Sequence, residues 1–109
     1  MKSILVITES IFDTQIIKLI ASQFPFRCQV IQIKPEEQSK KIKKNTYAVI
    51  VINPCFDKLP SKEWLTKNFA GPTLYLLSEK NKTIKNYILK PLDENSLKLA
   101  LLKCIQKSR

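Results

Sequence analysis

Short apolar runs recur along the chain, and five of them have the composition of buried β-strands. They are apolar and in part β-branched, as is typical of strands in a sheet. In the third run, Tyr-Ala-Val-Ile-Val-Ile, no polar residue alternates with the apolar ones. This pattern indicates burial on both faces, at the centre of a parallel sheet. The predicted strands are residues 2–7, 28–33, 47–52, 72–77 and 87–89.

A helical period of apolar positions predicts a first helix between the first two strands. Ser10 can cap this helix, and Asp13 in the first turn is favoured by the helix dipole. The pattern continues to Phe24, and Pro25 ends it. The residues expected to face the core are Phe12, Ile16, Leu19 and Ile20.

A second amphipathic helix is predicted after the last strand, capped by Asp93 and continuing to about residue 106. Leu99 and Leu102 fall off its core arc, on a side otherwise occupied by lysine and glutamine. They are a candidate surface for self-association or for a protein partner, and two ordinary exposed leucines are the alternative. The expected core positions are Leu97, Ala100, Leu101, Cys104 and Ile105.

Two weaker helices are predicted at residues 35–44 and 61–68. The first begins with Pro35 and two glutamates, ends in lysines and has little apolar surface, so we expect it to lie on the outside. Its lysines form either a solvated face or a site for an anionic partner. The candidate anion-binding residues are Lys40, Lys41, Lys43 and Lys44.

Strands alternate with helices along the whole chain, an order typical of an α/β sandwich with a parallel sheet. At 109 residues the chain is long enough for one hydrophobic core but not for two. Hydrophobic residues make up 44% and charged residues 26%, which is ordinary for a folded domain. We therefore expect residues 1–109 to form a single domain.

Residue types that are rare or missing exclude several kinds of site. Gly71 is the only glycine, so no loop can be a glycine-rich phosphate cradle. Without histidine, the three cysteines lack a usual zinc co-ligand, and Cys55 lacks a base to activate it as a nucleophile. Paired carboxylates are missing as well, so we expect no enzymatic activity, no metal, no cofactor and no small-molecule substrate.

The net charge of +10 leaves the class of partner open. A basic protein attracts anionic partners, so a small nucleic-acid-binding protein is an alternative function. Only Arg27 and Arg109 are arginines, whereas specific nucleic-acid readers concentrate arginines and exposed aromatic residues. We recognise no signal peptide and no membrane span, and expect a cytoplasmic protein with no membrane partner.

Three stretches resemble the receiver domain of bacterial two-component response regulators. They read Ile-Leu-Val-Ile-Thr-Glu-Ser at residues 4–10, Tyr-Ala-Val-Ile-Val-Ile-Asn at residues 47–53 and Asn-Tyr-Ile-Leu-Lys-Pro-Leu at residues 86–92. The last is similar to the aromatic-x-x-Lys-Pro signature of that family. The resemblance implies a flavodoxin-like, three-layer sandwich whose five-stranded, mainly parallel sheet has the order 2-1-3-4-5.

The same resemblance implies a degenerate phosphorylation site. Receivers hold Mg²⁺ with acidic residues after the first strand and with the acceptor aspartate, because this cation prefers carboxylate oxygens. The matching positions here are Thr8, Glu9 and Asn53, which keep one carboxylate. The amide of Asn53 is not a nucleophile toward phosphorus, so phosphorylation in the family's manner is not expected.

Residues that sense the phosphoryl group in receivers are partly kept. Lys90 matches the family's lysine, and we expect its ammonium group to contact Glu9 or the side-chain oxygen of Asn53 instead. Tyr87 matches the switch aromatic residue. The switch hydroxyl falls on Leu77 or, after a shift of one residue, on Ser78.

The connection before the fifth strand is short, with eight residues between Ser78 and Tyr87. A parallel crossover usually needs about a dozen residues or more, so the family's fourth helix must be shortened or missing. Alternatively, the fifth strand returns antiparallel as a hairpin. In either case the resemblance implies a pseudo-receiver, a non-catalytic signalling domain that binds a protein partner or a second copy without phosphorylation.

Overall fold

The computed structural model describes residues 2–34, 47–52, 69, 71–78, 86–90 and 92–107. The five predicted strands are confirmed in this part of the chain, and so are the two helices predicted after the first and the last strand. Two strands begin slightly later than the apolar pattern suggested, at Val49 and Thr73. In chain order the elements are β1 (Lys2–Ile7), α1 (Ile11–Ser22), β2 (Cys28–Ile33), β3 (Val49–Ile52), β4 (Thr73–Leu77), β5 (Tyr87–Leu89) and α4 (Glu94–Lys107).

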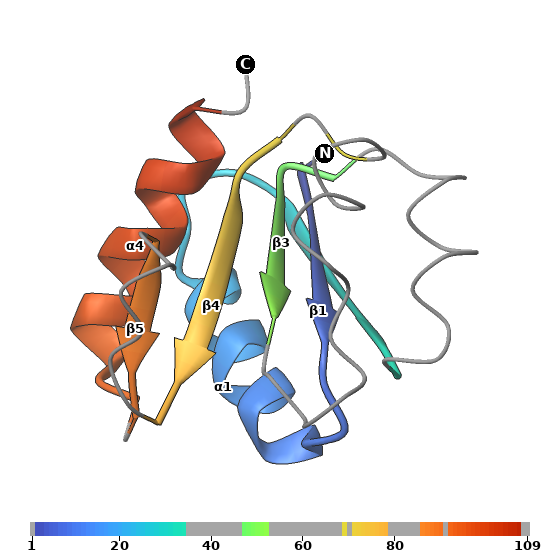
Figure 1. The fold of residues 1–109 in the computed structure, drawn as a ribbon. Helices are drawn as coiled ribbons and strands as arrows, with labels where there is room; N and C mark the ends of the chain where they lie inside the picture. The colour runs from blue at the N-terminus through green and yellow to red at the C-terminus, as the bar shows by residue number, and fades with distance from the viewer. Residues whose placement is uncertain are drawn as a thin grey trace.

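The five strands form one sheet in the order β2-β1-β3-β4-β5. Every pairing is parallel, so the arrowheads in Figure 1 all point toward the same edge of the sheet. This is the flavodoxin-like order that the resemblance implied. β1 pairs with β2 on one side and with β3 on the other, which places the N-terminal strand inside the sheet.

The alternative of an antiparallel fifth strand was wrong, because β5 lies parallel to β4. Asn86 provides the physical reason, since it holds the start of β5 beside the start of β4. Its side-chain amide donates to the carbonyl of Thr73 at 2.7 Å, and its own carbonyl accepts the N–H of Tyr75 at 3.1 Å. The expectation of a shortened or missing fourth helix concerns residues 79–85, which lie outside the described residues.

The centre of the sheet is buried on both faces, as the uninterrupted apolar run in the third strand predicted. Alternate residues of β1 and β3 belong to separate clusters: Ile4 and Val49 lie in one, Leu5 and Ile50 in the other. Both described helices contribute to the first cluster, through Ile17 of α1 and Leu101 of α4 among others. α1 and α4 therefore pack on the same face of the sheet, as can be followed in Figure 1.

The core face of α1 differs from the predicted one. Ile20 is buried as expected, but Phe12 is 71% exposed and Leu19 is 57% exposed. The prediction was wrong because this helix has apolar residues on opposite sides, and periodicity alone does not select between them. The first turn of the helix is oriented so that Thr14, and not Phe12, is buried. The hydroxyl of Thr14 donates to the carbonyl of Ser10 at 3.2 Å. The buried residues of α1 are Thr14, Ile17, Ile20 and Ala21.

α4 confirms its predicted core face and cap. Its carboxylate cap, Asp93, accepts the backbone N–H of Ser96 at 3.0 Å and the hydroxyl of the same residue at 2.7 Å. Ala100 is half-buried and packs against the core cluster. The fully or nearly fully buried residues of this helix are Leu97, Leu101, Cys104 and Ile105.

Several sequence predictions concern residues outside the described ranges. They include the weak helices at residues 35–44 and 61–68, the lysines at positions 40, 41, 43 and 44, and both Asn53 and Cys55. Neither α1 nor α4 is long and apolar enough to cross a membrane.

Two leucines of α4 provide a matched test of this packing. Leu101 is fully buried, so Leu101→Ala should lower the free energy of unfolding by about 2–5 kcal/mol through lost burial and a residual cavity. Leu99 is 61% exposed, so Leu99→Ala should change it by no more than about 0.5 kcal/mol. Urea titration followed by circular dichroism measures both, and equal losses would contradict the orientation of α4.

The Asp93 cap should make part of the stability depend on pH. Hydrogen bonds from the side chain and then the backbone of Ser96 lower the pKa of this carboxyl below its ordinary value. The stabilisation is therefore fully present above that ordinary value and is lost as the pH falls through the lowered one. Asp93→Ala should lower Tm at neutral pH, and the difference from wild type should narrow in acid. A difference that stays constant with pH would contradict the role of the charged carboxylate.

Candidate functional site

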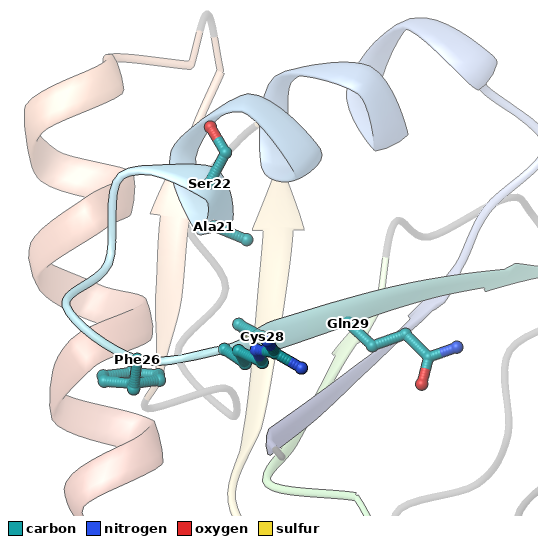
Figure 2. A pocket seen from close by; sticks show the side chains of 6 residues that line it. Ala21, Ser22, Phe26, Cys28 and Gln29 are labelled. Carbon is teal, nitrogen blue, oxygen red and sulfur yellow. The ribbon is translucent and has the colours of Figure 1, made fainter.

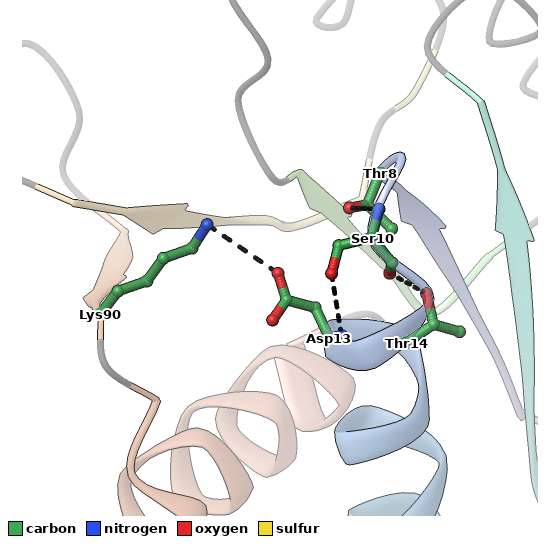
Figure 3. Close-up of polar contacts among 5 residues, drawn as sticks. All are labelled: Thr8, Ser10, Asp13, Thr14 and Lys90. Carbon is green, nitrogen blue, oxygen red and sulfur yellow. Dashed lines mark hydrogen bonds and ion pairs between the residues drawn. The ribbon is translucent and has the colours of Figure 1, made fainter.

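Polar residues follow the strands at the carboxyl edge of the sheet, where parallel α/β folds place their sites. Thr8 comes directly after β1, Ser78 after β4 and Lys90 after β5. α1 begins at the same edge, and Figure 3 shows its first turn next to Thr8 with the side chain of Lys90 extended toward it. The parallel topology therefore brings residues from the two ends of the sequence to one place.

Thr8 is completely buried, and its hydrogen bonds join the end of β1 to the start of α1 and to β2. Its hydroxyl oxygen accepts the backbone N–H of Ser10 at 2.9 Å. Its backbone N–H donates to the carbonyl of Ile33 at 3.1 Å, and its carbonyl accepts the side-chain amide of Gln32 at 3.3 Å. Thr8 thus builds the β1–α1 turn and holds it against β2.

Ser10 fixes the start of α1, as the sequence predicted. Its hydroxyl oxygen accepts the backbone N–H of Asp13 at 3.3 Å, and its carbonyl accepts the hydroxyl of Thr14 (Figure 3). These contacts set the rotation of the first turn. As a result Asp13 is directed across the carboxyl edge of the sheet, toward the end of β5.

Asp13 and Lys90 form an ion pair across this edge, with 3.8 Å between Oδ2 and Nζ. The side chain of Asp13 is 13% exposed and that of Lys90 is 32% exposed, so the pair is only partly solvated. The backbone N–H of Lys90 donates to the carbonyl of Leu77 at 2.8 Å. Both ends of the pair are therefore anchored, one in the first turn of α1 and the other beside β4.

The sequence did not identify Asp13 as a partner of Lys90. It pointed to Glu9 or Asn53, a contact that stays a prediction, and treated Asp13 only as a favourable charge near the helix N-terminus. A usable signal was present, because the helix after the first strand begins at the carboxyl edge of the sheet. An acidic residue in its first turn lies within reach of a lysine at the end of a neighbouring strand.

Of the other predicted site residues that the structure describes, some lie near the carboxyl edge and one lies at the opposite end of its strand. Glu9 and Ser78 are exposed near the carboxyl edge, and Leu77 is buried as the last residue of β4. Tyr87 is half-buried at the start of β5, one strand length before this edge. Asn53 lies outside the described residues. Among the residues that the structure describes, no group of three His, Cys, Asp or Glu side chains is placed to hold a metal ion.

The predicted leucine surface on α4 is only partly exposed. Leu99 faces outward, whereas Leu102 is half-buried and packs against the core cluster. More apolar surface is exposed on α1, where Ile11 is 65% exposed beside Phe12. The sequence missed this surface because it assigned Phe12 and Leu19 to the core.

An open hollow of about 570 Å³ lies at the C-terminal end of α1. Figure 2 shows Ser22 and Ala21 on the helix above, and Cys28 and Gln29 at the start of β2 below. Burial raises the pKa of the Cys28 thiol, which disfavours the reactive thiolate. The Cys28 thiol is therefore a poor candidate for a nucleophile in this hollow.

Comparison with known proteins relates this fold to receiver domains. The structure is similar to a CheY-like response regulator receiver domain protein from Methanospirillum hungatei, with a TM-score of 0.76, 14% identity, and coverage of 99% of this chain and 96% of that one. For the receiver domain of a sensor histidine kinase from Pseudomonas aeruginosa, which has a magnesium ion coordinated in its active-site cleft, the TM-score is 0.70 at 14% identity, covering 96% and 98%. The structure is also similar to a chemotaxis response regulator of Vibrio cholerae, with a TM-score of 0.66, 16% identity, and coverage of 100% of this chain and 99% of that one.

The fold of this chain is that of CheY-like receiver domains. No family model matches the sequence, and no curated protein matches it significantly. The likeness is therefore one of architecture alone.

The ion pair can be measured with a double-mutant cycle. Asp13→Asn, Lys90→Met and the double variant should give a coupling free energy of about 0.3–1 kcal/mol in urea unfolding, because the pair is only partly buried. Lys98→Met, combined with Asp13→Asn, serves as the control, since the described contact of Lys98 is with Gln23 at 3.5 Å. Equal coupling in the two cycles would contradict a specific pairing of Asp13 with Lys90.

Proposed function

We propose that this protein is a pseudo-receiver: a non-catalytic regulatory domain that binds a protein partner and does not depend on phosphorylation. The observation that carries the proposal is the ion pair between Asp13 and Lys90. Lys90 matches the lysine with which receivers sense a phosphoryl group. Here its ammonium group has a carboxylate partner within the same chain, so it has a negatively charged neighbour without any phosphate.

The residue at the first acidic position supports the same proposal. A receiver needs carboxylates there for Mg²⁺, and the similar Pseudomonas aeruginosa domain has a magnesium ion coordinated in its cleft. In this chain the position holds Thr8, whose neutral hydroxyl is already hydrogen-bonded to the backbone of Ser10. Glu9 is the only neighbouring carboxylate kept from the family's pattern, and the acceptor position holds Asn53.

The proposal also accounts for the parts of a receiver that this chain retains. The sheet, the capped start of α1 and the tethered Lys90 preserve the architecture of a receiver, while chemistry at the edge is replaced by contacts within the chain. A domain of this kind regulates by being present or absent at a partner's surface. Its affinity for the partner then replaces a phosphorylation equilibrium.

Incubation with Mg²⁺ and a small-molecule phosphodonor, followed by intact-mass measurement, tests this function. Wild type should gain no stoichiometric, acid-labile phosphate, because an amide does not form an acyl phosphate. Asn53→Asp alone should also fail to give robust phosphorylation, since Thr8 leaves the metal site short of a carboxylate.

The informative control is the double variant Thr8→Asp with Asn53→Asp, which restores both acidic positions. It should accept more phosphate than Asn53→Asp, provided that circular dichroism shows it folded. A stoichiometric adduct on wild type would overturn the pseudo-receiver proposal. Robust labelling of Asn53→Asp alone would show that Thr8 does not limit the metal site.

A further inference from the structure

The sheet has two outermost strands, β5 and β2, and they differ in how well their outer edges are protected. β5 is three residues long, whereas β2 pairs with β1 over six residues without a bulge. Among the elements that the structure describes, none pairs with β2 on the side away from β1. Natural sheets protect such an edge with short strands, charges, prolines or bulges. β2 reads Cys-Gln-Val-Ile-Gln-Ile and has none of these, so its outer edge is suited to accept another strand.

The backbone groups on this outer edge follow from the hydrogen bonds on the inner one. The carbonyls of Arg27 and Ile33 each accept, at 3.1 Å, a backbone N–H from β1 or from the residue that follows it. Successive residues of a strand direct their N–H and C=O groups to opposite sides. The N–H and C=O groups of Cys28, Val30 and Gln32 therefore point away from β1. They form the row of donors and acceptors with which an added strand pairs.

The side chains of β2 also leave apolar surface that an added strand would cover. Val30 is half-buried against the core cluster on the α1 side, and Ile31 is half-buried against the cluster on the other face of the sheet. The hollow at the C-terminal end of α1 adjoins the start of this edge, because Cys28 and Gln29 line it (Figure 2). An extended segment beside β2 therefore buries apolar surface on both faces of the sheet, in addition to pairing with its backbone.

The charges at the two ends of β2 select the occupant of this edge. Arg27 precedes the strand and Lys34 follows it, and both are exposed. Two copies of the protein paired antiparallel about the centre of β2 would place Arg27 of each copy opposite Lys34 of the other, and like charges in that position are destabilising. The net charge of +10 on each copy adds to this repulsion. An extended segment with acidic residues at both ends has the complementary charges.

We propose that the outer edge of β2 binds an extended segment of another protein, acidic at both ends, as an additional strand of the sheet. The segment pairs with the outward N–H and C=O groups of Cys28, Val30 and Gln32, and its acidic side chains meet Arg27 and Lys34. This inference rests on the proposed function, because it names the surface and the class of partner for a domain that acts by binding alone.

A titration with synthetic peptides tests strand pairing and charge separately. The probe is a fluorescent peptide of alternating valine and threonine with two glutamates at each end. One control peptide has lysines in place of the glutamates. The second control keeps the glutamates and has prolines at alternate central positions, which remove the N–H groups that a strand needs. Fluorescence anisotropy should show the probe binding at least about tenfold more tightly than either control.

Hydrogen exchange followed by NMR locates the bound peptide on the protein. In the free protein the N–H groups of Gln29 and Ile31 point toward β1 and should exchange slowly, whereas those of Val30 and Gln32 point outward and should exchange fast. With the probe at about ten times its Kd, exchange at Val30 and Gln32 should slow by about tenfold. Gln29 and Ile31 should remain slow.

Protein variants separate the backbone contribution from the charges. Val30→Pro removes an outward N–H but no hydrogen bond to β1, so it should weaken binding of the probe by about tenfold or more. Val30→Thr keeps the N–H and the branched shape, and as the matched control it should leave binding unchanged. Arg27→Glu with Lys34→Glu reverses both end charges without altering the strand, and should make the lysine-ended peptide bind more tightly than the probe. Circular dichroism checks that all the variants are folded.

Each other outcome overturns the inference. Absence of binding, or protection only of amides outside β2, would remove this edge as the binding site, and equal binding of the proline peptide would reduce the interaction to charge. A dimer of the protein alone, abolished by Val30→Pro in sedimentation, would make a second copy the occupant. These failures are separate from that of the proposed function, which is overturned by a phosphate adduct whether or not the probe binds.

Discussion

The hydrogen-bond ladders that β1 forms along both of its edges determine where every other described element lies. Because the strand is flanked by β2 and β3 and buried on both faces, its side chains have no route to solvent except at its ends. All five strands are parallel, so their carboxyl ends meet at one edge. The helix that follows β1 must begin there too, and every polar feature of the candidate site depends on this arrangement.

At that edge, polar side chains form a short chain of local contacts. Thr8 accepts from Ser10, Ser10 accepts from Asp13, and Asp13 pairs with Lys90 at the other end of the sequence. The edge is thus organised by the chain's own side chains, and this organisation is the observation on which the proposed function rests.

The sequence was sufficient for the sheet, because uninterrupted apolar runs and polar breaks locate strands directly. It was also sufficient for α4, whose buried residues lie on the arc that the pattern predicted. It was insufficient for α1, since a helix with apolar residues on two sides has two equivalent core faces until the turn before it is built. The contacts of Ser10 and Thr14 make that selection, and they come from local geometry rather than from hydrophobic period.

The direction of β5 and the partner of Lys90 were unpredictable for a related reason. A short connection favours a hairpin on entropic grounds, but here β5 lies parallel to β4, and Asn86 donates one hydrogen bond to β4 and accepts another from it. The contact between Lys90 and Asp13 depends on the rotation of α1 about its own axis, and neither composition nor spacing indicates that rotation. In both cases a single side chain, fixed by its neighbours, outweighed the general tendency.

The anchored carboxylate of Asp13 can also be viewed as a competitor. A group tethered in the same molecule has an effective concentration in the millimolar range or above, and it is never diluted. An external anion that approaches Lys90 competes with this resident group. Because the pair is worth about 0.3–1 kcal/mol, the competition weakens the apparent affinity of such an anion by about two- to fivefold.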